Sequence, residues 1–506
     1  MTLPPEIFPE PISFKQIVFV VMTIGYFAVA IPAAIKFPWV EKVCIFGILF
    51  MAINPVDVTF FSYTHYRGDI RGIEFGVVDW MIITMIITMQ FAPRWKRRKL
   101  HYRSPNEVLL WAYFAWCAAS IAWAMVPQFS FFGVTRLIRA YALFWVAYNY
   151  IRDEEDLRFV VNCVVGLTIY SFVQVLLDKY QRGVFPPRGS FDHQNSLVTF
   201  QNVMNFIVFA MLMGDNDKLF DRRNLIYWVA LGAGSLTSVA TLSRGGMVTM
   251  VMGYALMTPI LLWLKQPGKK RGKKLAALGL MLLATLPILV VILPPIIDRF
   301  EHAPKESAEA RDVFNEVARE MGNTHVLGIG LNNYSFGSGF MEQYRDQLPP
   351  IDQGGLAHNI YWLHFAELGF VGRSLWVLLM LGFIVVLLRF ILKRRDSLER
   401  IFAVGLLAGF VIAMLIGKLE WNFRQTQLTF TYLMMAGFAS SLARVEAERL
   451  QAARQRKQQM LALAAYARQQ AMGGGAQAAP AMPQRPGRHG GRGRRSARGR
   501  GRAAGR

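Results

Sequence analysis

The feature that most constrains this chain is a series of long apolar runs. Each is roughly 17 to 19 residues long, close to the length that a helix needs to cross a bilayer. Six clear examples are residues 17–35, 75–91, 197–213, 247–264, 275–293 and 401–417. A buried helix of a soluble protein rarely lacks a polar face over such a length. The runs therefore predict an all-α polytopic membrane protein with about 12 to 13 transmembrane helices.

The composition divides the chain into three parts. Residues 1–442 hold the apolar runs and are predicted to form one transmembrane domain, with one long outer loop at 294–357. Residues 443–472 are rich in Ala, Gln, Arg and Glu, which predicts a cytoplasmic or surface-lying helix. Residues 473–506 form a low-complexity tail that is rich in Arg and Gly, and we expect this tail to be disordered.

The basic loops predict the topology. Loops 93–105 and 265–274 each hold six Lys or Arg, and loop 393–400 holds four. Lys and Arg are retained on the cytoplasmic side during insertion. Counting spans between these loops places four segments on the outer side: residues 54–72, 178–195, 242–245 and 294–357. We therefore expect a bacterial inner-membrane protein with its N-terminus outside, its C-terminus in the cytoplasm, and a short surface-lying helix near residues 313–321.

Much of the formal charge of +23 lies in the tail, because residues 485–506 carry nine arginines and no acid. A basic tail on the cytoplasmic face is attracted to anionic lipid by roughly 1 kcal/mol per basic residue. Its composition is also typical of RNA-binding Arg-Gly segments. We favour anionic lipid as the partner and regard nucleic acid as the weaker alternative.

Motifs of nucleotide-driven and metal-dependent soluble enzymes are missing from the sequence. It contains no GxxxxGK[ST] phosphate loop, no HExxH, no CxxC and no GxSxG. Cys44, Cys117 and Cys163 lie in apolar stretches without metal-ligand spacing, so we interpret them as small hydrophobic residues. The expectation is an enzyme or transporter that needs no cofactor and no metal.

Polar residues gather instead at the predicted outer ends of spans. They are Arg188 with His193 and Asn195, Arg244 in a tight turn between two spans, Arg311 in the long loop, and His358-Asn359 with Glu367 where that loop re-enters the membrane. Arginine forks bind phosphate oxygens and cannot deprotonate, so they stabilise a pyrophosphate leaving group. A neutral imidazole can take a proton from a sugar hydroxyl.

Each of these residues also has an ordinary structural interpretation. Arg244 could anchor a helix at the interface by snorkelling, and Arg188 and Arg311 could be solvated loop charges. A histidine at a helix start, such as His358, is often only a cap or an interface residue. The residues by themselves therefore indicate an anion site on the outer face and do not specify a reaction.

In their order along the chain, these motifs resemble the O-antigen ligase and polymerase superfamily. The matching pieces are Arg188-Gly-Ser-Phe with Asn195, Ser243-Arg244-Gly245, Arg311 before Gly328-Ile-Gly330, and His358-Asn359 with Glu367-Leu368-Gly369. They cover residues 185–372, and the long outer loop lies in the expected place. The resemblance implies a helical membrane glycosyltransferase that uses an undecaprenyl-pyrophosphate glycan as donor.

The resemblance also implies roles for individual residues. His358 would be the base that activates the acceptor hydroxyl, Arg188 and Arg311 would hold the pyrophosphate, and Arg244 would give a further phosphate contact. Attack opposite the leaving group would invert the anomeric centre without a metal. His193 departs from the expected motif and is a candidate to share the proton transfer, and Asn359 and Glu367 are candidate supporting residues.

The acceptor stays open, because relatives transfer glycans to lipid A core, to another lipid-linked repeat unit, or to proteins. A transporter or flippase for lipid-linked saccharides is a rival hypothesis, which predicts charged residues buried along a pathway. The nearest examples in the spans are Asp79, Arg136, Arg139 and Asp178. A membrane scaffold acting through its basic tail is a third alternative.

Overall fold

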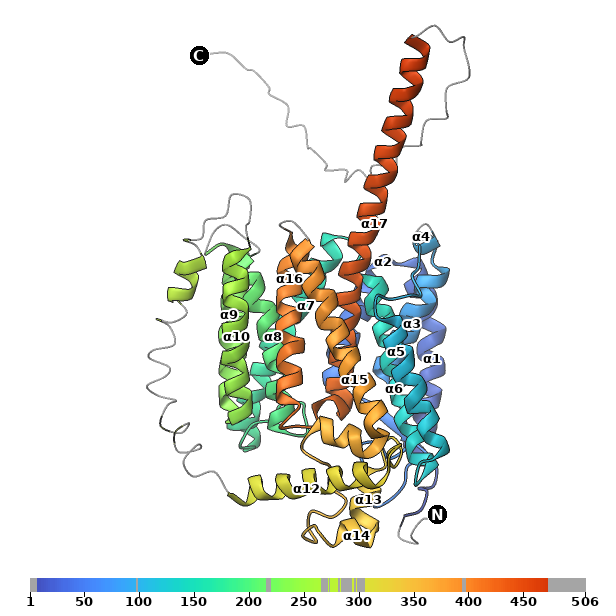
Figure 1. Ribbon diagram of the computed structural model, residues 1–506, viewed down its shortest axis with the longest axis vertical. Coiled ribbons are helices and arrows are strands. Elements are labelled where there is room, and N and C mark those ends of the chain that lie inside the picture. The colour runs from blue at the N-terminus through green and yellow to red at the C-terminus, as the bar shows by residue number, and fades with distance from the viewer. Residues whose placement is uncertain are drawn as a thin grey trace, which may run out of the picture. The chain divides into compact units, whose positions relative to one another are not determined.

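The computed structural model describes residues 7–96, 99–214, 220–264, 305–393 and 397–471, with a few further positions between 272 and 297. It divides into two compact units, residues 1–446 and 447–506. The first unit is a bundle of helices (Figure 1) with one small hairpin. The predicted all-α class is thereby confirmed.

The first half of the bundle contains these helices: α1 (Phe14–Lys36), α2 (Pro38–Ile53), α3 (Val77–Phe91), α4 (Pro93–Lys96), α5 (Glu107–Ala119), η1 (Ser120–Ala122), α6 (Pro127–Tyr150), α7 (Glu154–Leu177) and the short π-helical turn η2 (Asp178–Arg182). The second half contains α8 (Gln194–Gly214), α9 (Arg222–Ala240), α10 (Arg244–Trp263), α12 (Lys305–Thr324), α13 (Tyr334–Phe340), α14 (Glu342–Arg345), α15 (Ile360–Lys393), α16 (Leu398–Ile416), η3 (Asn422–Arg424) and α17 (Thr426–Ala471).

Local sequence explains where several helices begin. Pro38 and Pro127 occupy the first turns of α2 and α6, where a missing N–H costs nothing. The side chains of Asp153 and Ser243 accept hydrogen bonds from the backbone N–H groups of Asp156 and Gly246, three residues on. Polar caps between apolar runs therefore divide the chain into separate helices.

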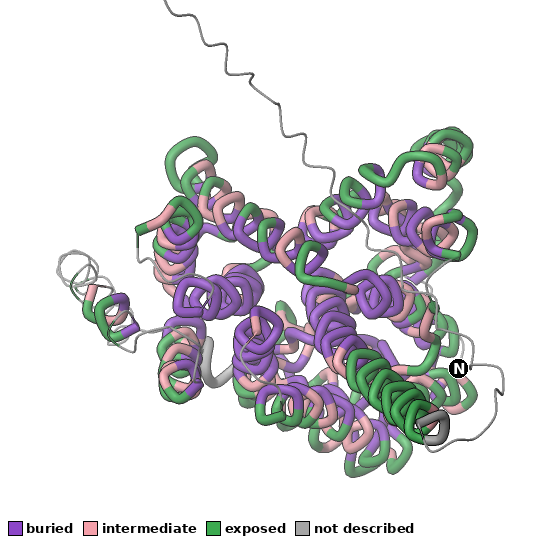
Figure 2. Tube along the Cα trace, turned by 90° about the horizontal axis from the view of Figure 1, so that it is seen from above, coloured by how far each residue is buried: buried purple, intermediate pink, exposed green. Residues whose placement is uncertain are grey.

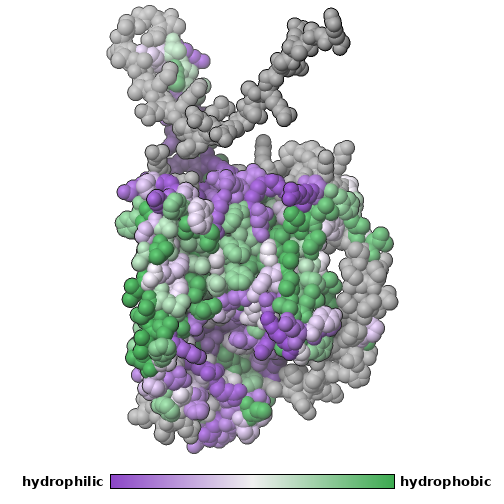
Figure 3. All heavy atoms as spheres, turned by 180° about the vertical axis from the view of Figure 1, so that it is seen from behind, coloured by the Kyte–Doolittle hydropathy of each residue, from purple (hydrophilic) through white to green (hydrophobic). Residues whose placement is uncertain are grey.

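Seven helices in the described part of the chain are long and apolar enough to cross a membrane: α1, α6, α7 with η2, α8, α10, α15 and α16. Two shorter apolar helices, α3 and α5, accompany them. Figure 3 shows hydrophobic side chains around the middle of one face of the bundle and hydrophilic ones toward both ends. The protein is a multi-pass membrane protein. The predicted span at residues 275–293 lies mostly outside the described residues, so 12 to 13 crossings stay a prediction.

Helices α8 and α16 form the interior of the bundle. Every residue of the apolar stretch of α8 is buried, as is 83% of that of α16. Helix α8 packs against α7, α9, α10 and α16. Figure 2 shows the same division, with buried residues gathered inside and exposed residues around the rim. By contrast, α1 is only 11% buried and contributes mainly a lipid-facing surface.

A two-stranded antiparallel hairpin, absent from the sequence-based prediction, lies between α2 and α3. Strand β1 (Asp57–Phe60) pairs with β2 (Ile73–Gly76), with Asp57 opposite Gly76 and Phe60 opposite Ile73. The loop between the strands enters the protein, because Tyr66 is fully buried and its hydroxyl donates to the carbonyl of Asn332. The segment therefore joins the beginning of the chain to the long loop before α15.

The described parts of the four segments predicted to share one side lie at one end of the bundle. Arg67 of the hairpin loop donates to the carbonyls of Ile351 and Gln353, and Ser190 donates to Asn54. Helix α12 runs across this end (Figure 1), and we call it the α12 end. The helix predicted near residues 313–321 is present and extends over the whole of α12.

Helix α4 and the start of α16, which carry described basic residues of two of these loops, lie at the opposite end of the bundle (Figure 1). Arg94 donates to the carbonyls of Ala34 and Ile35, and Lys42 forms an ion pair of 2.9 Å with Glu155. Arg444, near the end of the first unit, donates to the carbonyl of Ile151. The loop at 265–271 lies outside the described residues. In the described residues, the basic loops and the predicted outer segments thus lie at opposite ends, and the cytoplasmic side stays a prediction.

The second unit is described through Ala471. It continues α17, and its side chains from residue 447 to 468 are exposed apart from the half-exposed Tyr466. The predicted boundary at residue 442 falls within this continuous helix. The predicted disordered tail, residues 473–506, lies outside the described residues.

Candidate functional site

One buried carboxylate at the α12 end joins three residues from distant parts of the sequence. Oε1 of Glu420 accepts a hydrogen bond of 2.5 Å from Nδ2 of Asn195 and one of 3.2 Å from Nη2 of Arg311. Its Oε2 lies 3.6 Å from Nδ1 of His358. The Glu420 side chain is 7% exposed, whereas those of Arg311 and His358 are 33% and 30% exposed. We call these four residues the Glu420 cluster.

His358 lies just before α15 and is packed from the α12 side. The ring of Phe314 on α12 meets the imidazole edge-to-face, with the two ring centroids 6.0 Å apart. Nδ1 of His358 is buried and has no hydrogen-bond partner among the described residues, although Glu420 lies close to it. The ring is therefore oriented with Nδ1 toward the carboxylate and Nε2 away from it.

Arg188 is exposed on a loop whose backbone is fixed by Asp178. Oδ2 of the buried Asp178 accepts from the N–H groups of Arg188 and Gly189, at 3.1 and 2.7 Å. Its other oxygen pairs with Arg182 at 2.9 Å. Nη1 of Arg188 donates to the carbonyl of Asp192, so the guanidinium folds back over the loop that carries His193.

His193 shares the electrostatic environment of the cluster. Its Nδ1 accepts from the backbone N–H of Asn195, two residues on, at 3.1 Å. The neighbouring protein desolvates the ring and thereby lowers the pKa of His193 from its ordinary value; the carboxylate of Glu420 opposes this shift, while Arg311 and Arg188 add to it. A lowered pKa keeps this imidazole neutral near pH 7.

Arg244 is the first residue of α10 and is exposed at the same end of the bundle. A Cβ on its neighbour Gly245 would lie 3.3 Å from Leu419, next to Glu420 in the chain. Behind the turn, Nδ2 of the buried Asn202 donates to the carbonyl of Gly246 at 2.8 Å. The Oδ1 of Asn202 accepts from Ser238 at 2.9 Å. Asn202 thus ties α8 to both helices that flank the arginine turn.

Asn359 caps the helix that follows His358. Its Oδ1 accepts from the N–H groups of Tyr361 and Trp362, and its Nδ2 donates to the carbonyl of Lys418 at 3.1 Å. The residue thus holds the start of α15 against the segment that carries Glu420. These contacts give Asn359 a structural role, and its predicted support of the reaction stays a prediction.

Glu367 lies apart from the Glu420 cluster, in a sealed ion network. It is fully buried, forms an ion pair with Arg424 of η3, and accepts from the N–H of Tyr334. Asp69 of the hairpin loop faces Arg424 at 3.7 Å and pairs with Arg136 of α6. These four side chains are at most 6% exposed. We call them the sealed network.

A second buried group surrounds Arg139, one turn further along α6. Arg139 pairs with Asp57, Glu74 and Asp79 at distances of 2.8 to 3.0 Å. This group, the sealed network and the Asp178–Arg182 pair together contain the charged span residues on which the transporter hypothesis rests. These residues are Asp79, Arg136, Arg139 and Asp178. Each of them is held by an oppositely charged partner.

Two glycine motifs meet in a backbone seam. Helix α15 bends at Gly369, whose φ is +66°. The carbonyls of Ala366 and Glu367, which the bend frees, accept from the N–H groups of Ile329 and Gly330 at 2.9 and 2.8 Å. A Cβ on Gly328 would lie 2.4 Å from the Glu367 carbonyl, so only glycine fits. The Gly328-Ile-Gly330 and Glu367-Leu368-Gly369 motifs therefore hold one another.

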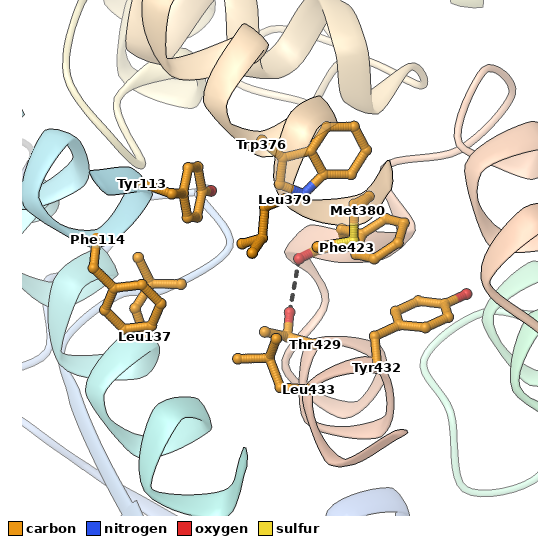
Figure 4. Close-up of a pocket in the computed structure, with 10 residues that line it drawn as sticks. All are labelled: Tyr113, Phe114, Leu137, Trp376, Leu379, Met380, Phe423, Thr429, Tyr432 and Leu433. Carbon is orange, nitrogen blue, oxygen red and sulfur yellow. Dashed lines mark hydrogen bonds between the residues drawn. The ribbon is translucent and has the colours of Figure 1, made fainter. Parts of the chain in front are cut away.

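A small, mostly apolar cavity among the described residues lies elsewhere. Figure 4 shows its lining by side chains of α5, α6, α15, η3 and α17, with Thr429 donating to the carbonyl of Phe423. None of the predicted site residues lines it. Its volume of about 30 Å³ has room for about one water molecule, too little for a sugar or a lipid chain.

No group of three or more His, Cys, Asp or Glu side chains in the described residues is arranged to hold a metal ion. The Glu420 cluster instead combines arginine, imidazole and amide groups around one carboxylate. This donor set suits an anionic ligand, because a divalent cation prefers several oxygen ligands.

The fold and this cluster define a multi-pass membrane protein with an arginine- and histidine-bearing site at one end of a helical bundle. Residues 229–377 match the family described as O-antigen ligase. The match confirms, over this region, the predicted resemblance to the O-antigen ligase and polymerase superfamily. It includes Arg244, Arg311, His358 and Glu367, whereas Arg188 and Glu420 lie outside it. No curated protein matches the chain in sequence.

Sequence reasoning missed Glu420. The residue follows the apolar run of α16 in a short Lys418-Leu419-Glu420 segment that belongs to no quoted motif. The one available signal was an acid directly at the predicted outer end of a span, where a nearby arginine or histidine can pair with it.

Proposed function

We propose that the protein is an O-antigen ligase-like glycosyltransferase that transfers a glycan from undecaprenyl pyrophosphate to an acceptor hydroxyl during surface polysaccharide assembly. The observation that carries the proposal is the Glu420 cluster, which joins Arg311, His358 and Asn195 at the α12 end. We further propose that this end faces the periplasm, since described residues of the basic loops, such as Arg94, lie at the opposite end.

In the proposed reaction, Nε2 of His358 removes the proton of the acceptor hydroxyl as its oxygen attacks the anomeric carbon. A new C–O bond forms on the face opposite the pyrophosphate, and the bond from that carbon to the pyrophosphate oxygen breaks. The leaving undecaprenyl pyrophosphate keeps the electron pair, and the anomeric configuration inverts. Glu420 lies beside Nδ1 and stabilises the imidazolium that forms.

Arg311, Arg188 and Arg244 would bind the pyrophosphate and the charge that develops on it. Arg311 uses one of its five N–H donors on Glu420 in the described residues, so its fork keeps donors for phosphate oxygens. His193, whose lowered pKa keeps its imidazole neutral, is a second candidate for the proton transfer. The proposed chemistry draws on side chains of this chain and uses no metal or nucleotide.

The decisive experiment gives purified full-length protein an undecaprenyl-pyrophosphate glycan, with and without lipid A core, in the presence of EDTA. New product only with the core acceptor supports a ligase. A ladder of longer lipid-linked chains without it supports a polymerase of the same superfamily. Movement of intact donor across vesicles without any new glycosidic bond would reject the transferase and support a flippase.

A further inference from the structure

Arg373 lies in a cradle of aromatic rings on α15, four residues after the bend at Gly369. Its guanidinium carbon is 4.7 Å from the ring centroid of Phe365, 5.5 Å from that of Phe370 and 5.6 Å from that of Trp362. Long side chains on a helix point toward its N-terminus. The guanidinium therefore reaches back toward the α12 end, where α15 begins.

Arg373 differs from Arg311, Arg136 and Arg424 because the described part of the protein supplies no anion to it. In the described part of the chain, no hydrogen bond or ion pair reaches its guanidinium, although the residue is half-buried. Arg311, Arg136 and Arg424 each pair with a carboxylate. Ring faces attract the cation but do not accept its five in-plane N–H groups, so those donors call for oxygen atoms from outside the protein.

The surroundings of Arg373 indicate where those oxygens come from. Phe370 is 61% exposed and Val371 42%, on a helix that is long and apolar enough to cross a membrane. Val326 and Leu327, which lie against the bend, are 77% and 45% exposed. Such a surface faces lipid. At the edge of the bilayer, the first anionic groups that the Arg373 guanidinium meets beside this surface are lipid phosphates.

The cradle is also distinct from the Glu420 cluster. A Cβ on Gly322 of α12 would lie 2.3 Å from the Phe365 ring, whereas Phe314 of α12 meets His358. Eight residues separate these two positions, which is about 12 Å along a helix. The cradle therefore belongs to the same end of the bundle, further along α12.

We propose that Arg373, with Trp362, Phe365 and Phe370, binds the phosphate of a lipid in the leaflet at the α12 end. This lipid is separate from the donor whose pyrophosphate the Glu420 cluster would hold. The site follows from the geometry of α15 and does not depend on the transfer reaction. The phosphate has two possible sources, a bulk anionic phospholipid or a lipid-linked acceptor.

The test is titration of the purified full chain with phosphatidylglycerol, with bound lipid counted by native mass spectrometry. Arg373→Gln should weaken the tightest binding step roughly tenfold or more, because it removes charge-assisted hydrogen bonds. Arg319→Gln is the matched control, since it removes a charge of the same end that already pairs with Glu316. Unchanged binding in Arg373→Gln, or an equal loss in Arg319→Gln, overturns the proposal.

A second variant covers the case in which Arg373→Gln does not fold. Phe365→Leu leaves every charge in place and opens the cradle, so it should weaken the same binding step by several-fold. Wild-type affinity in Phe365→Leu would then count against the site.

Kinetics in phosphatidylcholine vesicles identify the source of the phosphate. If Arg373→Gln raises the KM for the lipid-linked acceptor and leaves the KM for the donor unchanged, the bound phosphate belongs to the acceptor. If Arg373→Gln binds phosphatidylglycerol more weakly but has unchanged KM values for donor and acceptor, the phosphate belongs to a bulk phospholipid. Because lipid binding is measured without turnover, failure of this site is distinguishable from failure of the proposed transfer reaction.

Discussion

Two groups of arginines and carboxylates occupy the same end of the bundle and differ in their access to solvent. In the sealed network, Arg136 and Arg424 face Asp69 and Glu367, and no side chain is more than 6% exposed. In the Glu420 cluster, the carboxylate is equally buried, but Arg311 and His358 are each about one-third exposed. The two groups contain similar side chains. Their exposure suggests a structural role for the sealed network and a functional role for the Glu420 cluster.

The two groups also differ in the balance between their positive and negative side chains. The sealed network sets two arginines against two carboxylates, so its formal charges balance without a ligand. In the Glu420 cluster, one carboxylate is shared by Arg311, His358 and Asn195, so donors remain for an anion. The comparison indicates that changes in the first group should alter folding, and that changes in the second should alter turnover.

The largest expected effect comes from His358→Ala. Loss of a general base typically slows a reaction by about 10²- to 10⁴-fold, and we expect a loss of transfer in this range with an unchanged amount of membrane protein. Radiolabelled glycan transfer by purified protein measures it. His65→Asn, an exposed histidine of the same end, is the control. Near-normal transfer by His358→Ala would remove the proposed base.

The sealed network should respond in the opposite way. Arg424→Met leaves Glu367 buried without a cation, which typically costs about 3–5 kcal/mol of stability. We expect little folded protein, by detergent-solubilised size-exclusion chromatography. Adding Glu367→Gln should restore part of the yield. A well-folded Arg424→Met that has lost all transfer would instead place this network in the active site.

Arg311→Lys sharpens the comparison, because it retains the charge and removes the fork. We expect roughly a tenfold or greater drop in kcat/KM, since a point charge does not replace bidentate contacts to phosphate. Arg319→Lys on the same helix should have no effect. Full activity in Arg311→Lys would mean that Arg311 only neutralises Glu420.

Asn202→Leu tests whether the turn behind Arg244 is a positioning element. The variant removes the hydrogen bonds to Gly246 and Ser238, and we expect a several-fold fall in kcat. Asn205→Leu, one turn deeper in α8, is the control. If Asn202 acts through Arg244, the double variant with Arg244→Ala should be no slower than Arg244→Ala alone. Additive losses would refute this coupling.

The smallest expected effect concerns Glu74 beside Arg139. Burial raises the pKa of Glu74 to about 7, although Arg139 opposes the shift. The folded protein thus binds this proton more tightly than the unfolded chain does, so the stability gained is full below about pH 4.5 and is lost as pH rises to about 7. Glu74→Gln should flatten the change in Tm between pH 5 and pH 8. A Tm difference identical to that of wild type would contradict it.

The sequence predicted the helical class, the segments that meet at one end, and a surface helix, because hydrophobic runs and basic loops are local signals. It did not predict the hairpin, whose strands of four residues are separated by a long loop with no two-residue turn. Nor could it pair Glu367 with Arg424, 57 positions away, since a buried ion pair depends on tertiary packing. Glu420 escaped for the same reason.

The seam between the Gly328–Gly330 loop and the bend of α15 has a consequence for protein engineering. Each side supplies what the other lacks: one offers backbone donors, and the other offers carbonyls that a straight helix would have used itself. If the loop of a relative were grafted without residues 366–369, its backbone N–H groups would lack matching carbonyl acceptors on α15. The two stretches should therefore be exchanged together, as a single unit, when this loop is transplanted between relatives.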